Sequence, residues 1–185
     1  LAAAVGQVML FRREAYQASG GHASVRSSIV DDLSLSRRVA ALGLRWRVVT
    51  AADLVSCRMY RSGEDAIAGF AKNLFAAFDY RLLPFLFVYL FLGYVFWHPL
   101  FLLVWKLFGG VPAPGTAELI LCLGLALLVW LVPYLELGVP ASLAYLYPLT
   151  ILVVVIVALK SVTLGLRGRL NWKGRMIRLP GWKWV

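Results

Sequence analysis

Apolar residues dominate the second half of the chain, where they form three runs without a charged side chain: Leu82–Trp105, Leu119–Leu135 and Leu137–Leu159. These runs contain 24, 17 and 23 residues. A helix crosses a hydrocarbon core of about 30 Å with roughly 20 residues. The pattern therefore predicts three membrane helices and places the chain in a membrane.

The first 81 residues mix charged and apolar positions instead of forming long apolar runs. Their periodicity predicts, in order, a strand over 7–12, a helix over 13–19, a helix over 31–42, a strand over 44–49 and a strand over 54–60. The second helix is marked at both ends, because acids open it and Gly43 follows it. This order predicts the latter part of an α/β domain with an exposed or unpaired strand edge.

A third helix is predicted over residues 62–81, next to the first apolar run. Ser62 and Asp65 form an acidic variant of the capping box. Apolar residues then follow at helical spacing: Ile67, Phe70, Ala71, Leu74, Phe75 and Phe78. Such a stripe faces either a protein core or the lipid headgroup layer. In both placements the helix couples the water-facing residues to the bilayer.

Basic residues lie on both sides of the apolar runs. The formal charge is +10, 61% of the residues are hydrophobic, and the mean hydropathy is +0.78. Residues 1–81 hold eleven basic and seven acidic residues, and residues 160–185 hold seven basic residues and no acid. The net charge of +4 in residues 1–81 is too small to indicate nucleic acid as a partner. The basic residues of both segments are typical of cytoplasmic segments beside anionic lipid. Two cytoplasmic flanks disagree with three full crossings, so the sequence leaves the topology open.

The candidate chemistry lies in the acidic pair Asp31–Asp32, which opens the predicted helix over 31–42. Acids in the first turn of a helix are stabilised by its dipole, typically by about 0.3–1 kcal/mol. A purely structural role therefore explains the pair as well as a chemical one. A carboxylate at a helix start can also take a proton from a substrate hydroxyl. The residue types alone leave both roles open.

The residues around this pair resemble the second half of family-2 glycosyltransferases, which use a nucleotide-diphospho-sugar donor. The resembling stretches are Gly6–Tyr16, Gly20–His22 and Val30–Arg38, with Gly43 after them. In that family an acidic pair, usually Glu-Asp, opens this helix, and its second acid is the general base. The resemblance implies that Asp32 is the catalytic base and that Asp31, in place of the usual glutamate, borders the site.

The resemblance also implies a fold: a partial glycosyltransferase A-type α/β domain followed by an α-helical transmembrane bundle. The implied division is a catalytic part over 1–61, an interface helix over 62–81, about three transmembrane helices over 82–159 and a basic juxtamembrane tail over 160–185. The family's other half supplies the nucleotide pocket and an Asp-x-Asp motif that holds Mg²⁺ or Mn²⁺ on the diphosphate. Asp-x-Asp is absent from this sequence. The ligands of the divalent cation are therefore expected outside this chain, which alone is expected to be inactive.

Three further stretches, Arg58–Ser62, Gly69–Phe75 and Asn171–Arg175, are similar to membrane glycosyltransferases that modify carotenoids, hopanoids or sphingolipids such as ceramide. A Gln-x-x-Arg-Trp motif found in many relatives is absent. The candidates for its diphosphate-facing role are Arg61, Lys72 and Arg175, since cationic groups stabilise the departing diphosphate. Contact with phospholipid is the alternative for each of them. His22 is a candidate for substrate contact, against a structural role beside the turn.

Two hypotheses follow from the sequence. The first is a fragment of a membrane-bound glycosyltransferase that moves a sugar from a nucleotide donor to a lipid-like acceptor at the cytoplasmic face of a bacterial plasma membrane. The second is a non-enzymatic membrane protein, such as a transporter or assembly component, whose first 81 residues dock a partner. The lipid bilayer is a partner in both hypotheses, and nucleic acid is a partner in neither.

Overall fold

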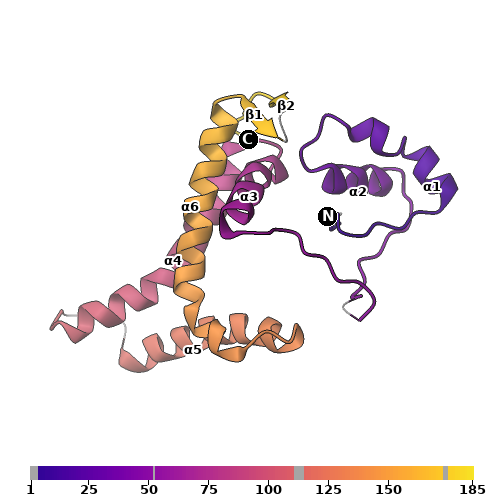
Figure 1. The fold of residues 1–185 in the computed structure, drawn as a ribbon. Coiled ribbons are helices and arrows are strands. Elements are labelled where there is room, and N and C mark those ends of the chain that lie inside the picture. The colour runs from indigo at the N-terminus through magenta and orange to yellow at the C-terminus, as the bar shows by residue number, and fades with distance from the viewer. Residues whose placement is uncertain (1–3, 52, 111–114, 173–174) are drawn as a thin grey trace. The chain divides into compact units, whose positions relative to one another are not determined.

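The computed structural model describes residues 4–51, 53–110, 115–172 and 175–185, with the side chains of residues 169–178 left aside. The chain divides into two compact units: Leu1–Tyr80 with Ser161–Lys183, called unit 1, and Arg81–Lys160 with Trp184–Val185, called unit 2. Helices dominate both units (Figure 1). In order, the elements are α1 (Arg13–Ala18), η1 (His22–Val25), α2 (Asp31–Ala41), α3 (Gly63–Ala77), α4 (Leu82–Leu107), α5 (Thr116–Glu136), η2 (Ala141–Leu146), α6 (Tyr147–Leu166), β1 (Arg169–Trp172) and β2 (Arg175–Arg178).

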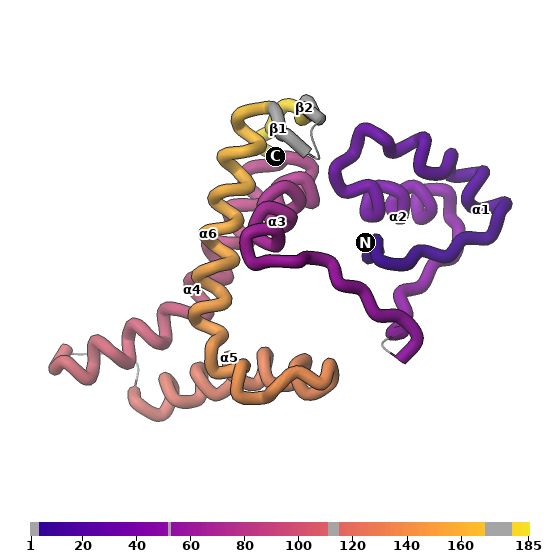
Figure 2. Tube along the Cα trace, viewed as in Figure 1, coloured from indigo at the N-terminus to yellow at the C-terminus, as the bar shows by residue number. Residues whose placement is uncertain are grey.

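The predicted α/β domain of glycosyltransferase A type is wrong. Residues 7–12, 44–49 and 54–60 form no strands, and Figure 2 shows the chain between α2 and α3 as an extended trace. A strand is stabilised by hydrogen bonds to a neighbouring strand, and none of these segments has such a neighbour among the described residues. The strands that the structure does describe are β1 and β2, an antiparallel pair in which Arg169 lies opposite Arg178.

The helices predicted before the first apolar run do form. α2 begins at Asp31 and ends two residues before Gly43, which has a left-handed φ of 69°. At the start of α3 the Ser62 hydroxyl accepts a hydrogen bond from the Asp65 N–H at 3.1 Å. The Asp65 carboxylate accepts one from the Arg61 N–H at 3.2 Å. These bonds satisfy N–H groups that a helix start leaves without an intrahelical partner.

One buried part of unit 1 lies where the second half of α3 meets the end of α6, besides the buried Leu35 and Val39 of α2. Phe75 is 1% exposed, and its backbone N–H donates a hydrogen bond to the buried Ser161 hydroxyl at 2.9 Å. The Phe75 ring fills the space that a Cβ would need at Gly165, one turn further along α6. A small residue at this position therefore allows the two helices to approach closely.

A tight turn connects α3 to α4. Asp79 and Tyr80 have left-handed φ angles of 54° and 60°, a conformation that is uncommon for residues other than glycine. The Tyr80 carbonyl accepts a hydrogen bond from the Lys183 N–H at 2.8 Å. The turn that precedes α4 and the C-terminal segment are therefore joined within unit 1.

Unit 2 contains α4, α5, η2 and most of α6. The Phe96 ring on α4 contacts Trp130 of α5 and Tyr147 of α6, with ring centroids 6.3 and 5.8 Å apart. The Trp97 indole N–H also donates to the Pro148 carbonyl at 3.2 Å. The middle of α4 therefore packs against both other long helices, and α5 runs across the direction of α6 in Figure 1.

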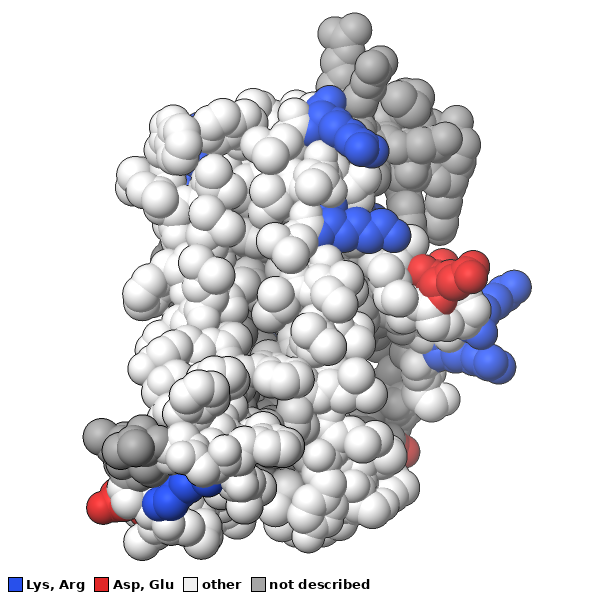
Figure 3. Space-filling model, turned by 90° about the vertical axis from the view of Figure 1, so that its left-hand side faces the viewer, with Lys and Arg blue, Asp and Glu red and all other residues white. Residues whose placement is uncertain are grey.

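Three helices are long and apolar enough to cross a membrane, as the three apolar runs of the sequence led us to expect. They are Leu82–Leu107, Thr116–Glu136 and Ala141–Leu166. The face of the molecule in Figure 3 carries a broad area without Lys, Arg, Asp or Glu, and the charged side chains in view lie at its margins. Such an area costs little to place in hydrocarbon and much to place in water.

Candidate functional site

The two acidic residues at the start of α2 lie in different surroundings. Asp31 is exposed, and one of its carboxylate oxygens accepts a hydrogen bond from the Asp32 N–H at 3.1 Å. Asp32 is half-buried, and its Oδ1 accepts one from the Leu33 N–H at 2.7 Å. Val30 occupies the N-cap position and supplies no side-chain bond. The aspartates themselves therefore satisfy N–H groups of the first turn, at the positive end of the helix dipole.

The second oxygen of the Asp32 carboxylate faces Gly6. A Cβ placed on Gly6 would lie 3.0 Å from Asp32 Oδ2 and 3.4 Å from Asp32 Cγ. Almost any side chain at this position would press on the carboxylate. The segment around Gly6 thus forms one wall beside Asp32, and the glycine leaves the space in which Oδ2 lies.

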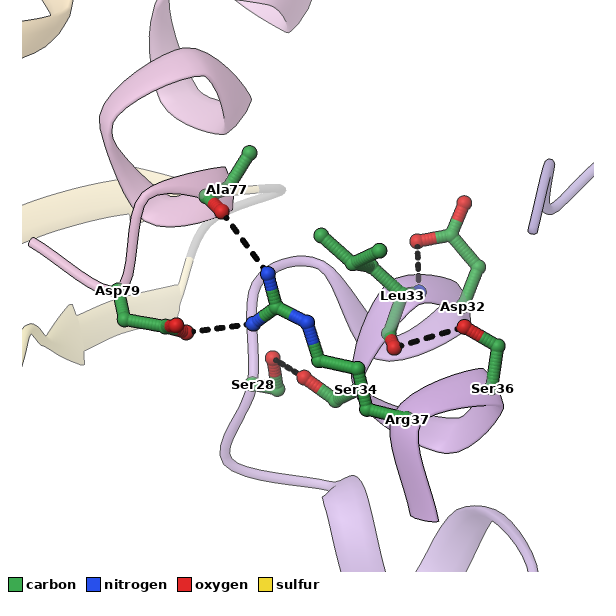
Figure 4. Close-up of polar contacts among 8 residues, drawn as sticks. All are labelled: Ser28, Asp32, Leu33, Ser34, Ser36, Arg37, Ala77 and Asp79. Atoms are coloured by element: carbon green, nitrogen blue, oxygen red, sulfur yellow. Dashed lines mark hydrogen bonds and ion pairs between the residues drawn. The ribbon is translucent and has the colours of Figure 1, made fainter. Parts of the chain in front are cut away.

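Arg37 lies on the side of α2 away from the Asp32 carboxylate (Figure 4). Its Nη1 is 2.7 Å from Asp79 Oδ1, and its Nη2 donates to the Ala77 carbonyl at 3.2 Å. The Arg37 and Asp79 side chains are 40% and 57% exposed. Exposed pairs of this kind contribute about 0–1 kcal/mol to the free energy of unfolding. We call the contacts of Arg37 with Asp79 and Ala77 the Arg37 clasp. They restrict the position of α2 more than they stabilise the fold.

An open pocket of about 320 Å³ lies in unit 1 beside this clasp. It is lined by Ser27, Ser28, Ile29, Val30, Ser34, Ala76, Asp79, Tyr80, Pro180, Gly181 and Lys183. The Ser28 and Ser34 hydroxyls hydrogen-bond to each other at 2.8 Å. Burial raises the pKa of the Tyr80 hydroxyl above its usual value, so this group stays protonated at neutral pH. Val30 and Ser34 line the pocket, and Asp32 between them does not.

His22 has a local partner. Its ring Nδ1 lies 2.9 Å from the Tyr16 hydroxyl, and its backbone N–H donates to the same hydroxyl at 3.1 Å. The Tyr16 ring also lies against Gly21, where a Cβ would come within 2.5 Å of it. The contacts of His22 therefore organise the turn between α1 and η1, and within the described residues they do not bring His22 to Asp32.

The cationic candidates lie on three separate elements. Arg61 is exposed just before α3, where its backbone N–H bonds to Asp65. Lys72 is half-buried in the middle of α3. Arg175 begins β2, and its side chain lies outside the described residues, as does Lys173. The structure thus places all three residues in unit 1 without joining them into one described cluster.

The next feature is the set of side chains that could bind a metal ion. The described residues contain no group of three or more His, Cys, Asp or Glu side chains that could hold a metal ion. Asp31 and Asp32 use one oxygen each on backbone N–H groups. This arrangement does not fit the six or more oxygen ligands of a hard divalent cation. No chemical step is therefore assigned here to a metal.

Sequence reasoning missed the contacts that connect distant parts of unit 1. Arg37 lies inside a recognised stretch, but its partner Asp79 is 42 residues away. Ser161 lies 86 residues from Phe75. The tail was predicted from its charge alone. The hydrogen bond from the Lys183 N–H to the Tyr80 carbonyl joins two backbone groups, so the residue types do not predict it.

Comparison with known proteins assigns the family. The family model described as glycosyl transferase family 21 matches residues 1–165, a stretch that includes α2, α4, α5 and all but the last residue of α6. No curated protein and no solved structure matches the chain. The prediction of a glycosyltransferase is confirmed, but the family shown is family 21 rather than family 2. The chain belongs to glycosyl transferase family 21.

Proposed function

We propose that this protein transfers a sugar from a nucleotide-diphospho-sugar to a hydroxyl of a lipid-like acceptor at a membrane surface, with Asp32 as the general base. The observation that carries the proposal is the family match, which extends from residue 1 to residue 165 and so covers both Asp32 and nearly all of the three apolar helices. A transferase with that much apolar chain meets its acceptor at the bilayer.

The reaction is a substitution at the anomeric carbon of the sugar. The acceptor oxygen forms a bond to that carbon, the bond from the carbon to the diphosphate oxygen breaks, and the diphosphate leaves with the electron pair. The proton of the acceptor hydroxyl passes to Asp32. Its carboxylate suits this role because Oδ1 is held by the Leu33 N–H, while Oδ2 faces Gly6 and forms no described hydrogen bond. Proton transfer to a positioned base typically accelerates such a step by 10²–10⁴-fold.

The chain passes directly from unit 1 into the apolar helices, and this supports the proposal of a lipid-like acceptor. Arg37 bonds to Asp79, and α4 begins three residues later at Leu82. Trp182 and Trp184 lie at the end of the basic tail, and tryptophan is enriched at membrane interfaces. A lipid acceptor could therefore present its hydroxyl near α2 while its chains stay in the bilayer.

Cationic side chains are the proposed partners of the donor diphosphate. Arg61, Lys72 and Arg175 carry positive charge in unit 1, and guanidinium and ammonium groups stabilise the charge that builds on a departing diphosphate. A divalent cation, Mg²⁺ or Mn²⁺, would neutralise the same charge when bound. The residues described here do not supply a site for it.

We place the catalytic part on the cytoplasmic side of a bacterial plasma membrane. Residues 1–81 and 160–185 hold 18 of the 19 basic residues, and residues 107–159 hold none. Lys and Arg favour the cytoplasmic side of membrane proteins. Residues 1–80 and 161–183 of these segments belong to unit 1, which is consistent with a shared face.

Sugar transfer in membranes tests the proposed function directly. Membranes that contain the full-length enzyme would be incubated with labelled nucleotide sugars and a total lipid extract, and lipid products would be separated and counted. The proposal predicts a labelled glycolipid that is absent from membranes without the protein. A lack of transfer from every nucleotide sugar tested would favour the alternative, a non-enzymatic membrane protein.

A further inference from the structure

Arg37 connects the helix that carries Asp32 to the turn that leads into the membrane. Asp32 lies in the first turn of α2, and Arg37 follows five residues later on the opposite side of the helix. Two different nitrogen atoms of its guanidinium bind two different groups, the Asp79 carboxylate at 2.7 Å and the Ala77 carbonyl at 3.2 Å. Two contacts from one planar group restrict both the position and the rotation of α2.

The acceptors of this clasp are themselves held in place. Ala77 is the last residue of α3, where carbonyl groups lack an intrahelical partner and the helix dipole favours a positive charge. Asp79 and Tyr80 form the left-handed turn, and the Tyr80 carbonyl is bonded to the Lys183 N–H. Phe75, two residues before Ala77, is buried against Ser161. Arg37 therefore binds to a rigid part of unit 1.

We infer that Arg37 is a positioning residue that sets the place of Asp32 relative to a bilayer-embedded acceptor. This inference rests on the proposed function, in which Asp32 takes the proton of a lipid hydroxyl. α4 begins directly after the clasped turn, so the turn marks where the chain enters the apolar segment. An acceptor anchored in the bilayer cannot follow a displaced base, whereas an acceptor free in water can.

The chain offers a matched control for Arg37 on the same helix. Arg38 is its neighbour, and its Nε donates to the Ser19 carbonyl at 3.0 Å, within residues 1–41 and away from the turn before α4. Arg38→Gln removes the same charge from α2 but leaves the clasp intact. A general loss of folding or of helix stability affects both variants in the same way.

The test compares two acceptors, a long-chain lipid alcohol in vesicles and a short-chain, water-soluble analogue. We expect Arg37→Gln to lower kcat for the vesicle acceptor by roughly 100-fold, the order of loss that a misplacement of about 1 Å can cause. The KM for the nucleotide sugar and the rate with the soluble analogue change much less. Arg38→Gln lowers the two rates by similar factors. Equal losses with both acceptors in Arg37→Gln would overturn the inference.

Exchanging the charges of Arg37 and Asp79 tests whether their ion pair is the contact that matters. Asp79→Asn removes the ion pair and should reproduce part of the Arg37→Gln defect, while Arg37→Asp combined with Asp79→Arg should recover part of the vesicle-specific rate. Failure of this double variant to improve on Arg37→Asp alone argues against the pair as the working contact.

A distance measurement between α2 and α3 tests the inference even where the rate of sugar transfer is too low to compare. Spin labels on Ala41 and Ile67, exposed positions on α2 and α3, report the distance between the two helices once Cys57 and Cys122 are replaced by Ser. The distance distribution should broaden in Arg37→Gln and not in Arg38→Gln; an unchanged distribution in Arg37→Gln contradicts the inference. If Asp32→Asn keeps its activity, the proposed function fails. If Asp32→Asn is inactive while the two arginine variants behave alike, only this inference fails.

Discussion

The backbone N–H of Lys183 donates a hydrogen bond to the carbonyl oxygen of Tyr80 over 2.8 Å. Tyr80 lies two residues before α4, and Ser161, near the end of α6, is bonded to Phe75 of the same unit. Both ends of the apolar segment are therefore tied to unit 1. A segment that leaves a membrane face and returns to it crosses the bilayer an even number of times, so three full crossings do not fit these contacts.

We predict that α4 and α6 cross the membrane and that α5 does not. α5 then begins and ends on the far side, where the segment 107–159 carries no Lys or Arg. Its direction agrees, since α5 runs across α6 in Figure 1. The Phe96 ring of α4 contacts Trp130 of α5.

Labelling of single cysteines in sealed vesicles measures this topology. In a chain with Cys57→Ser and Cys122→Ser, Thr116→Cys places a thiol at the start of α5, Ser142→Cys places one in η2 after its end, and Ser62→Cys marks unit 1; all three positions are exposed. An impermeant maleimide should reach Thr116→Cys and Ser142→Cys from one side and Ser62→Cys from the other. Labelling of Thr116→Cys and Ser142→Cys from opposite sides would show that α5 crosses.

The close approach of α3 and α6 predicts the effect of a small substitution. Gly165→Ala should lower the free energy of unfolding by about 1–3 kcal/mol, the usual cost of overpacking, because the Phe75 ring occupies the space for a Cβ. Gly124→Ala in α5 is the control, since no atom lies within 4 Å of a Cβ there. That change should be neutral or stabilise the helix by up to about 1 kcal/mol. Thermal unfolding in detergent compares the two, and equal effects would mean that Phe75 does not fill this space.

The cap of α3 predicts a local effect. Ser62→Ala removes the acceptor of the Asp65 N–H and should cost about 1 kcal/mol of helix stability. Hydrogen exchange of residues 63–67 should become faster, while Ser56→Ala, an exposed position in the extended stretch before α3, should leave it unchanged. Protection of the first turn that survives Ser62→Ala would assign the cap to other groups.

The sequence predicted the helices well because their signals are local. Ser62 and Asp65 are three positions apart at the start of α3, and Asp31 and Gly43 each lie beside the end of α2 that they mark. The three apolar helices follow from composition alone. None of these predictions required knowledge of which distant residues pack together.

The predicted strands failed because alternation does not specify a partner. Leu54, Val55 and Met59 are 87%, 41% and 53% exposed, so the apolar side of this stretch faces no core among the described residues. Of the candidate site, the sequence identified Asp31 and Asp32 at a helix start, and the structure places them there. Arg37 could not be assigned a role, because its contacts depend on how the chain brings α2 to the end of α3.

The variant Asp32→Asn tests our proposal that Asp32 is the general base of sugar transfer. Asp32→Asn keeps the size of the side chain and can still accept the Leu33 N–H bond, so a structural Asp32 should tolerate the change at a cost of at most about 1 kcal/mol. An amide cannot take the proton of the acceptor. Loss of a general base costs about 10²–10⁴ in rate.

The most direct measurement is therefore the rate of sugar transfer in the full-length enzyme, with Asp32→Asn and Asp31→Asn compared with the unchanged enzyme and donor binding followed in parallel. We predict that Asp32→Asn binds the nucleotide sugar almost normally and loses at least about 99% of its transfer rate. Asp31→Asn, whose exposed carboxylate binds the Asp32 N–H, should lose much less. A transfer rate for Asp32→Asn above roughly a tenth of the unchanged protein's rate, a loss well below that of a missing base, would contradict the assignment of Asp32.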